Sequence, residues 1–236
     1  VVLVCAALTF LMYCASQWIL GKEEMQEKRI RILLGLVLLY TLVFCVLWVT
    51  GACCIPVGDQ ASVCTAAEGF RTGDYTMLTR DSYEKYLFIH PHQLGLTALI
   101  ELIFAVFGVG NFKAFEYLNC LGAVLCVYSG YRITRLLTEE KRAWIYYLFL
   151  AAGCFPLFFY VTFVYGEIPS ITYSLAAVWM FLAYLKKQKW QYGLGCCIFC
   201  SLACLIRKNS LILLIAFLCV LLVKAVGKRQ WKQLVF

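Results

Sequence analysis

Three short polar segments separate long apolar stretches, and each carries side chains that could take part in a reaction. Asp59 lies in the segment Pro-Val-Gly-Asp-Gln just after an apolar block, where a carboxylate can accept a proton from an attacking hydroxyl. Glu167 is the only charge in residues 144–185, and an ionisable residue at the edge of a membrane core indicates function. Arg207 and Lys208 form a basic pair between two apolar blocks, and the planar fork of arginine suits phosphate.

Each of these residues also has a structural interpretation. Asp59 precedes a short helical pattern over residues 61–70 and could cap that helix, because aspartate is a favoured capping residue. Glu167 could likewise start a helix, since Pro169 follows it and acidic residues suit helix N-termini. Arg207 could serve only in a structural salt bridge. The residues alone leave both interpretations open.

The two histidines of the chain, His90 and His92, flank Pro91. A His-X-His pair near acidic residues could bind a metal ion, but two ligands do not make a site. The spacing therefore favours histidines that line a polar pocket or lie at an interface.

The segments around these residues have the composition of a membrane protein. Hydrophobic residues make up 63% of the 236 positions and charged residues 14%, whereas soluble domains are near half apolar and a quarter charged. The longer apolar blocks, such as residues 143–164, match the roughly 20 residues that cross a bilayer as a helix. A helix is required because the hydrocarbon core offers no water to backbone groups. The sequence predicts an all-α, polytopic transmembrane helical bundle.

Topology follows from clusters of basic residues between the apolar blocks. The positive-inside rule places all of them in the cytoplasm, so an even number of spans must separate successive clusters. We predict about seven spans, at residues 1–20, 33–53, 116–131, 143–164, 168–185, 192–206 and 211–223. The net charge of +8 then serves orientation rather than nucleic-acid binding. The four clusters are Lys22, Lys28, Arg29 and Arg31; Arg132, Arg135, Lys141 and Arg142; Lys186, Lys187 and Lys189; and Lys224, Lys228, Arg229 and Lys232.

One apolar segment, residues 94–109, does not fit as a span. It is short, it contains Glu101, and a crossing there would move a basic cluster to the outside. We expect a helix in the outer membrane interface instead. The outer face then receives a large loop over residues 54–93, the turn at 165–170 and the turn at 207–209.

Four short motifs, in this order, resemble the GT-C superfamily of membrane glycosyltransferases, especially the bacterial branch similar to protein O-mannosyltransferases and aminoarabinose transferases. The chain departs from the pattern of this superfamily in two ways. It has a glutamate, Glu167, at the second acidic position, where many relatives have aspartate, and it lacks an Asp-X-Asp pair in the first loop. At least one extra span also precedes that loop. The motifs are Asp59 followed by Ala66-Ala67; Tyr86 with His90-Pro91-His92-Gln93-Leu94-Gly95; Tyr165-Gly166-Glu167; and Leu205-Ile206-Arg207-Lys208-Asn209.

The resemblance implies transfer of a sugar from a polyprenyl-phosphate donor to an acceptor hydroxyl on a lipid, glycan or protein. It implies a multi-pass protein of the cell membrane, among membrane lipids, with the active site on the extracytoplasmic face. No cofactor and no metal site are expected, although a divalent metal ion remains compatible with the family. Catalytic roles fall to Asp59 as the base and to Glu167 as an acceptor-positioning or secondary acidic group. Substrate-binding roles fall to Arg207, Lys208, His90, His92, Gln93 and Tyr165.

Two other classes compete with an enzyme. A transporter or lipid flippase predicts charges near the bilayer midplane and an internal repeat, and the sequence has neither. A non-catalytic envelope-assembly subunit would use Asp59 and Glu167 only as caps. The enzyme hypothesis predicts that Asp59, Glu167 and Arg207 converge on one cavity. We expect residues 1–236 to form a single, incomplete transmembrane domain at the N-terminal end of a longer protein.

Overall fold

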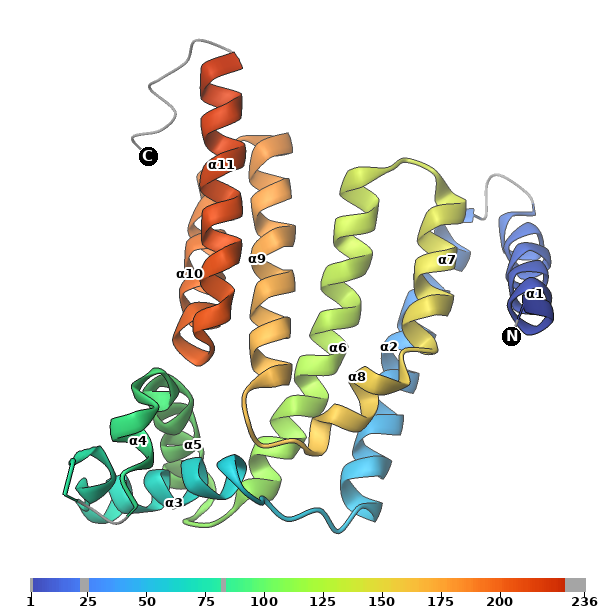
Figure 1. The fold of residues 1–236 in the computed structure, drawn as a ribbon. Helices are drawn as coiled ribbons and strands as arrows, with labels where there is room; N and C mark the ends of the chain where they lie inside the picture. Colours follow the sequence, from blue (N-terminus) through green and yellow to red (C-terminus); the bar gives the residue numbers. More distant parts are fainter. Residues whose placement is uncertain (1, 22–25, 82–83, 228–236) are drawn as a thin grey trace. The chain divides into compact units, whose positions relative to one another are not determined.

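A computed structural model describes residues 2–21, 26–81 and 84–227, and this part of the chain is helices joined by turns, without strands (Figure 1). The predicted all-α class is therefore confirmed. Four basic residues used to predict topology, Lys22, Lys228, Arg229 and Lys232, lie outside the described residues. The chain divides into two compact units, each described by itself. The prediction of a single domain over residues 1–236 stays a prediction.

The first unit contains Val1–Ile55 and Lys113–Val164. Its core has one cluster around Ile30, Ile145 and Leu148 and another around Cys45 and Phe158, so apolar side chains of α2 pack against those of α7 and α8. Its helices are α1 (Val2–Leu20), α2 (Gln26–Gly51), α6 (Phe112–Leu137), α7 (Lys141–Ala152), α8 (Phe155–Phe159) and the short η4 (Tyr160–Thr162).

A break near Gly153 separates α7 from α8, and the chain bends there by 45°. Pro156 lies in the first turn of α8, where a missing backbone N–H costs nothing. The predicted span over residues 143–164 is thus a bent pair of helices.

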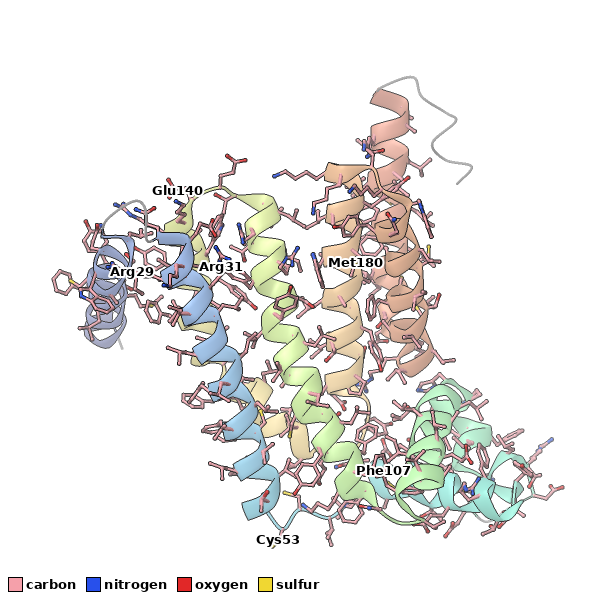
Figure 2. All side chains as sticks on the ribbon, turned by 180° about the vertical axis from the view of Figure 1, so that it is seen from behind. Arg29, Arg31, Cys53, Phe107, Glu140 and Met180 are labelled. Atoms are coloured by element: carbon pink, nitrogen blue, oxygen red, sulfur yellow. The ribbon has the colours of Figure 1, made fainter. Side chains whose placement is uncertain are left out.

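Two basic clusters lie at one end of the first unit. Figure 2 shows Arg29, Arg31 and Glu140 at this end and Cys53 at the opposite end. Arg135 pairs with Glu27 across 3.4 Å, and Lys141 Nζ donates to Gln26 Oε1 across 2.9 Å. The basic ends of α2 and α6 therefore lie at the same end of the unit, and the membrane face that they share stays a prediction.

The second unit contains Pro56–Phe112 and Tyr165–Phe236. Its core is built by α9, α10 and α11, where the rings of Phe181 and Phe217 stack at 4.2 Å. The elements are α3 (Asp59–Thr72), η2 (Thr76–Leu78), α4 (Tyr86–Ile89), η3 (Pro91–Gln93), α5 (Leu94–Phe107), α9 (Glu167–Lys187), α10 (Trp190–Ile206), η5 (Lys208–Ser210) and α11 (Leu211–Gly227).

The segment predicted as an interfacial helix is α5, and it packs against α3. Glu101, expected to face water or a cavity, is partly exposed and pairs with Arg71 of α3 across 3.3 Å. The position of α5 relative to a membrane stays a prediction.

Several helices are long and apolar enough to cross a membrane. Three qualify within the described residues, and the number rises to five if two pairs of helices with short breaks each count as one span. All seven predicted spans coincide with helices, but α10 is shorter than a usual span. The number seven stays a prediction.

Candidate active site

The hydroxyl of Tyr165 is the centre of a hydrogen-bond network in the second unit. It donates to Asp59 Oδ2 across 3.1 Å and accepts from Gln93 Nε2 across 2.7 Å. The hydroxyl of Tyr86 lies 2.9 Å away. A carboxylate can only accept a hydrogen bond, so the Tyr165 hydroxyl uses its proton to donate to Asp59. The hydroxyl of Tyr86 must therefore be the donor in the bond between the two tyrosines. Residues from α3, α4 and η3 therefore meet at the hydroxyl of Tyr165, which lies in the turn before α9.

Desolvation of the two phenols keeps these protons in place. Partial burial is the main cause that raises the pKa of Tyr86, and the hydrogen bond with Tyr165 adds to it. Burial is also the main cause that raises the pKa of Tyr165, with Asp59 nearby as a further cause. Both phenols therefore stay protonated at neutral pH, and Tyr165 remains a donor to Asp59.

Asp59 is the first residue of α3, and its side chain does not cap the helix. The N-cap residue is Gly58, whose φ of +57° favours glycine, and no side-chain capping bond forms. The carboxylate is exposed and oriented by Tyr165. The capping interpretation of Asp59 is therefore not what the structure shows.

Glu167 begins α9 and pairs with Arg207, which directly follows α10. The N-cap of α9 is Gly166, whose φ is +86°, and the Glu167 side chain makes no capping bond. A Cβ at Gly166 would lie 2.9 Å from Ile206 Cγ2, so the glycine lets the start of α9 approach the end of α10. This close approach brings the carboxylate to the guanidinium.

The Arg207 guanidinium also lies over the Tyr165 ring, 5.3 Å from its centroid, a cation–π contact. Arg207 therefore connects the Glu167 ion pair to the Asp59–Tyr165 network. The three residues predicted to converge are joined through Tyr165 and Arg207, and their convergence on one cavity stays a prediction. A pocket of about 80 Å³ is lined by Arg207, Lys208, Asn209, His92, Gln93 and Ile206, without either acid.

The histidines lie beside this network. The rings of His90 and His92 are 5.8 Å apart, and His90 is 4.9 Å from the ring of Tyr86. Within the described residues, no group of three or more potential ligands is arranged to hold a metal ion. Of the two histidines, His92 lines the small pocket that also contains Lys208, and His90 does not.

Two features of the site were not assigned from the sequence. Tyr86 belongs to the network, although only its place in a motif pointed to it. Gln93 was expected to bind substrate, yet its amide nitrogen serves Tyr165, while its Oε1 is buried without a hydrogen-bond partner. Glu167 Oε2 is likewise buried without one.

Comparison with protein families decides the class. The model of the family described as dolichyl-phosphate-mannose-protein mannosyltransferase matches residues 90–236. The chain belongs to this family. It is a GT-C membrane glycosyltransferase of the mannosyltransferase type, which favours an enzyme over a transporter or an assembly subunit. Comparison with curated proteins and with solved structures gave no significant match.

The matched region contains most of the network. Gln93, Tyr165, Glu167 and Arg207 lie inside residues 90–236, whereas Asp59 and Tyr86 precede them. The assignment of Asp59 thus depends on its contact with Tyr165 rather than on the family match.

Proposed function

We propose that this mannosyltransferase-family protein transfers a sugar from a polyprenyl-phosphate donor to an acceptor hydroxyl. The observation that carries the proposal is the hydrogen bond from Tyr165 to Asp59, beside a guanidinium that suits phosphate. A carboxylate oriented by a neighbouring donor and open to solvent is suited to take a proton.

The reaction follows from these positions. The acceptor oxygen attacks the anomeric carbon and forms the new glycosidic bond, while its proton passes to Asp59. The bond between the anomeric carbon and the phosphate oxygen breaks, and the polyprenyl phosphate leaves with the electron pair. Arg207 and Lys208 stabilise the negative charge on that phosphate. A phosphate is a stable anion, so no general acid is needed.

Glu167 takes a role that differs from simple acid–base chemistry. It engages one nitrogen of Arg207, and a guanidinium has five N–H donors. The remaining donors can face the phosphate while Glu167 holds the group in place.

A pocket of about 410 Å³ gives the acceptor a place near the base. It lies between α3 and α4 and is lined by Ser62, Thr65 and Tyr86, among others. Ser62 lies three residues after Asp59 and therefore on the same side of the helix. We assign His90 and His92 to the donor, because His92 lines the small pocket with Arg207 and Lys208.

We further propose a multi-pass protein of the cell membrane, with membrane lipids around its helices and this site on the extracytoplasmic face. The support is the placement of basic clusters at one end of the first unit together with the positive-inside rule.

The test is Asp59→Asn, assayed in membranes with a panel of polyprenyl-phosphate sugars and acceptors. The swap keeps size and removes the basic carboxylate, so transfer should fall by about 10²–10⁴-fold. Asp74→Asn is the matched control, because this exposed aspartate of the same loop accepts a hydrogen bond from the nearby Thr76 amide, a contact that the asparagine carbonyl retains. Near-full transfer by Asp59→Asn would place the base elsewhere.

A further inference from the structure

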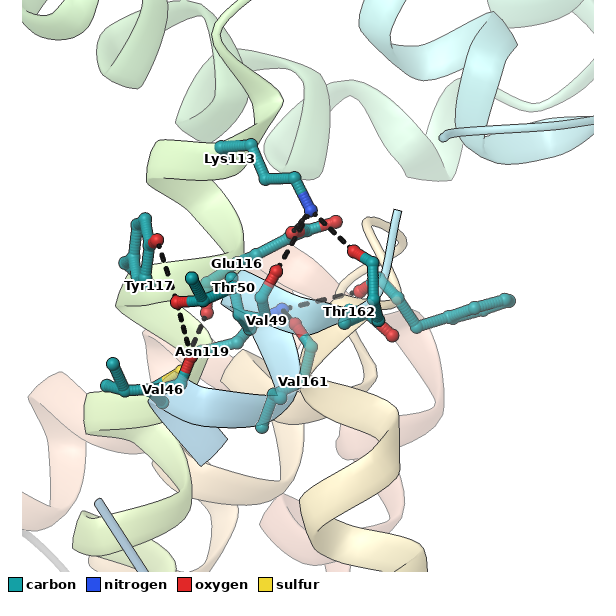
Figure 3. Close-up of polar contacts among 12 residues, drawn as sticks. Val46, Val49, Thr50, Lys113, Glu116, Tyr117, Asn119, Val161 and Thr162 are labelled. Atoms are coloured by element: carbon teal, nitrogen blue, oxygen red, sulfur yellow. Dashed lines mark hydrogen bonds and ion pairs between the residues drawn. The ribbon is translucent and has the colours of Figure 1, made fainter. Parts of the chain in front are cut away.

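A polar cluster in the first unit lies around three residues on one side of α6 (Figure 3). Lys113 Nζ lies 2.8 Å from Glu116 Oε2, 3.2 Å from the Val49 carbonyl and 3.1 Å from the Ala52 carbonyl. One ammonium group thus joins α6 to the end of α2. We call Lys113, Glu116 and Asn119 the α6 clasp.

Lys113 donates hydrogen bonds to carbonyls at the C-terminal end of α2. The last carbonyls of a helix lack partners within the helix, and the negative end of the helix dipole favours a cation. Glu116 is fully buried, and a buried carboxylate requires a charged partner. Lys113 therefore serves two carbonyls at the end of α2 and one oxygen of Glu116 together.

Asn119 lies three residues after Glu116 and so on the same side of α6. Its Nδ2 donates to the Val161 carbonyl across 2.9 Å and to the Phe163 carbonyl across 3.3 Å. The Val161 carbonyl belongs to η4 and the Phe163 carbonyl to the irregular segment after it, so the side-chain amide of Asn119 joins both to α6.

The clasp contacts occur where the chain leaves the first unit. The chain passes between the units after Ile55, before Lys113 and after Val164. The Ala52 contact is three residues before the first passage, Lys113 stands at the second, and the Phe163 contact is one residue before the third. Asp59 follows the first passage by four residues, and Tyr165 follows the third directly.

We propose that Lys113, Glu116 and Asn119 are positioning residues that hold all three connections at their first-unit ends. The clasp fixes where the segments carrying Asp59 and Tyr165 begin. Its effect on sugar transfer rests on the proposed function, whereas its hold on the backbone does not.

Hydrogen exchange of backbone amides in the whole protein tests the hold on the backbone. Lys113→Met removes the donors and keeps the length of the side chain, so exchange in residues 48–52 should rise at least tenfold. Asn119→Leu keeps the size and the Lys113–Glu116 pair, so exchange should rise in residues 160–165 and stay unchanged at 48–52. Leu121→Ala is the control on the same helix, because the Leu121 side chain is exposed and carries no polar atom, and it should change neither segment.

Unchanged exchange in both segments would overturn the proposal, as would an equal rise throughout the chain in both variants. If Lys113→Met does not fold, Asn119→Leu decides alone, since it leaves the ion pair intact.

Sugar transfer tests the positioning role. Both variants should lower kcat at least fivefold with less than a twofold change in donor KM, and Lys113→Arg should restore part of the Lys113→Met loss because it keeps the charge. Local loosening without any loss of kcat would overturn the positioning role. Absence of transfer in the unmodified protein would instead contradict the proposed function, and the exchange result would still stand.

Discussion

The Tyr165 hydroxyl has one proton and two lone pairs, and the network uses all three. The proton goes to Asp59, and the lone pairs accept from Tyr86 and Gln93. A phenol with every position occupied has few alternative orientations. At the scale of single residues, this oxygen determines the direction in which the Asp59 carboxylate faces.

Tyr165→Phe should therefore lower kcat more than it raises KM. The ring that supports Arg207 remains, but Asp59 loses its donor and the buried Gln93 amide loses its acceptor. Loss of such a partner costs about 1–3 kcal/mol, which is roughly five- to 150-fold in rate. Steady-state kinetics measures the effect. Tyr86→Phe is the matched control, since Tyr86 does not contact Asp59, and it should lose less; equal losses would contradict a special role for Tyr165.

Arg207 and Glu167 should act as a unit. Arg207→Ala should weaken use of the phosphate-bearing donor, and Glu167→Gln should have an intermediate effect because it removes the charge that holds the guanidinium. Residues in one ion pair show coupling energies of about 0.5–3 kcal/mol. A double-mutant cycle on kcat/KM for the donor should find the double variant little worse than Arg207→Ala. Strictly additive losses would show that the pair has no joint role.

At the scale of elements, the site depends on close approach of helices in the second unit. Gly95 of α5 lies directly against the Leu205 carbonyl near the end of α10, and a Cβ there would overlap that oxygen. Leu205 precedes Arg207 by two residues, so this contact helps to fix the position of Arg207. Packing of α5 against α3 and α10 brings Gln93 and Asp59 to the same region.

Gly95→Ala should destabilise the second unit and reduce transfer. The nearest atoms belong to backbone and cannot move cheaply, and overpacking costs about 1–3 kcal/mol. Gly35→Ala in α2 is the control, because nothing lies within 4 Å of a Cβ there, and alanine should stabilise the helix by up to about 1 kcal/mol. Thermal unfolding in detergent compares the two. Equal stability of both variants would show that α5 and α10 are not in close contact.

At the scale of the whole molecule, orientation in the membrane depends on charge. At one end of the first unit, Arg135 of α6 pairs with Glu27 of α2, and Lys141 of α7 donates to Gln26 of α2. The candidate site is built from segments that the positive-inside rule assigns to the other face. A single orientation would therefore keep catalysis outside the cytoplasm.

Cysteine labelling in a background without native thiols should confirm this orientation. Positions near Gln26, Glu140 and Gln188 should react only from the cytoplasm, and positions near Ser62, Glu167 and Asn209 only from outside. Reaction of Asn209 from the cytoplasmic side alone would separate Arg207 from the outer face and contradict the topology.

The sequence by itself determined the class of the protein and most positions of its helices. The long apolar blocks are enough for this, because a bilayer leaves the backbone little choice but a helix. Single short motifs also pointed to Asp59, Glu167 and Arg207, since charge in an apolar chain is costly and therefore informative.

Only the tertiary structure decided how these residues act together. The sequence indicated neither the hydroxyl of Tyr165 as the shared partner, nor Tyr86 as a member of the network, nor Glu167 as the partner of Arg207. These contacts join residues about 40 to 106 positions apart. A local sequence pattern does not indicate contacts between residues so far apart along the chain. Helix packing and the close approach of helices at Gly95 and Gly166 determine these contacts.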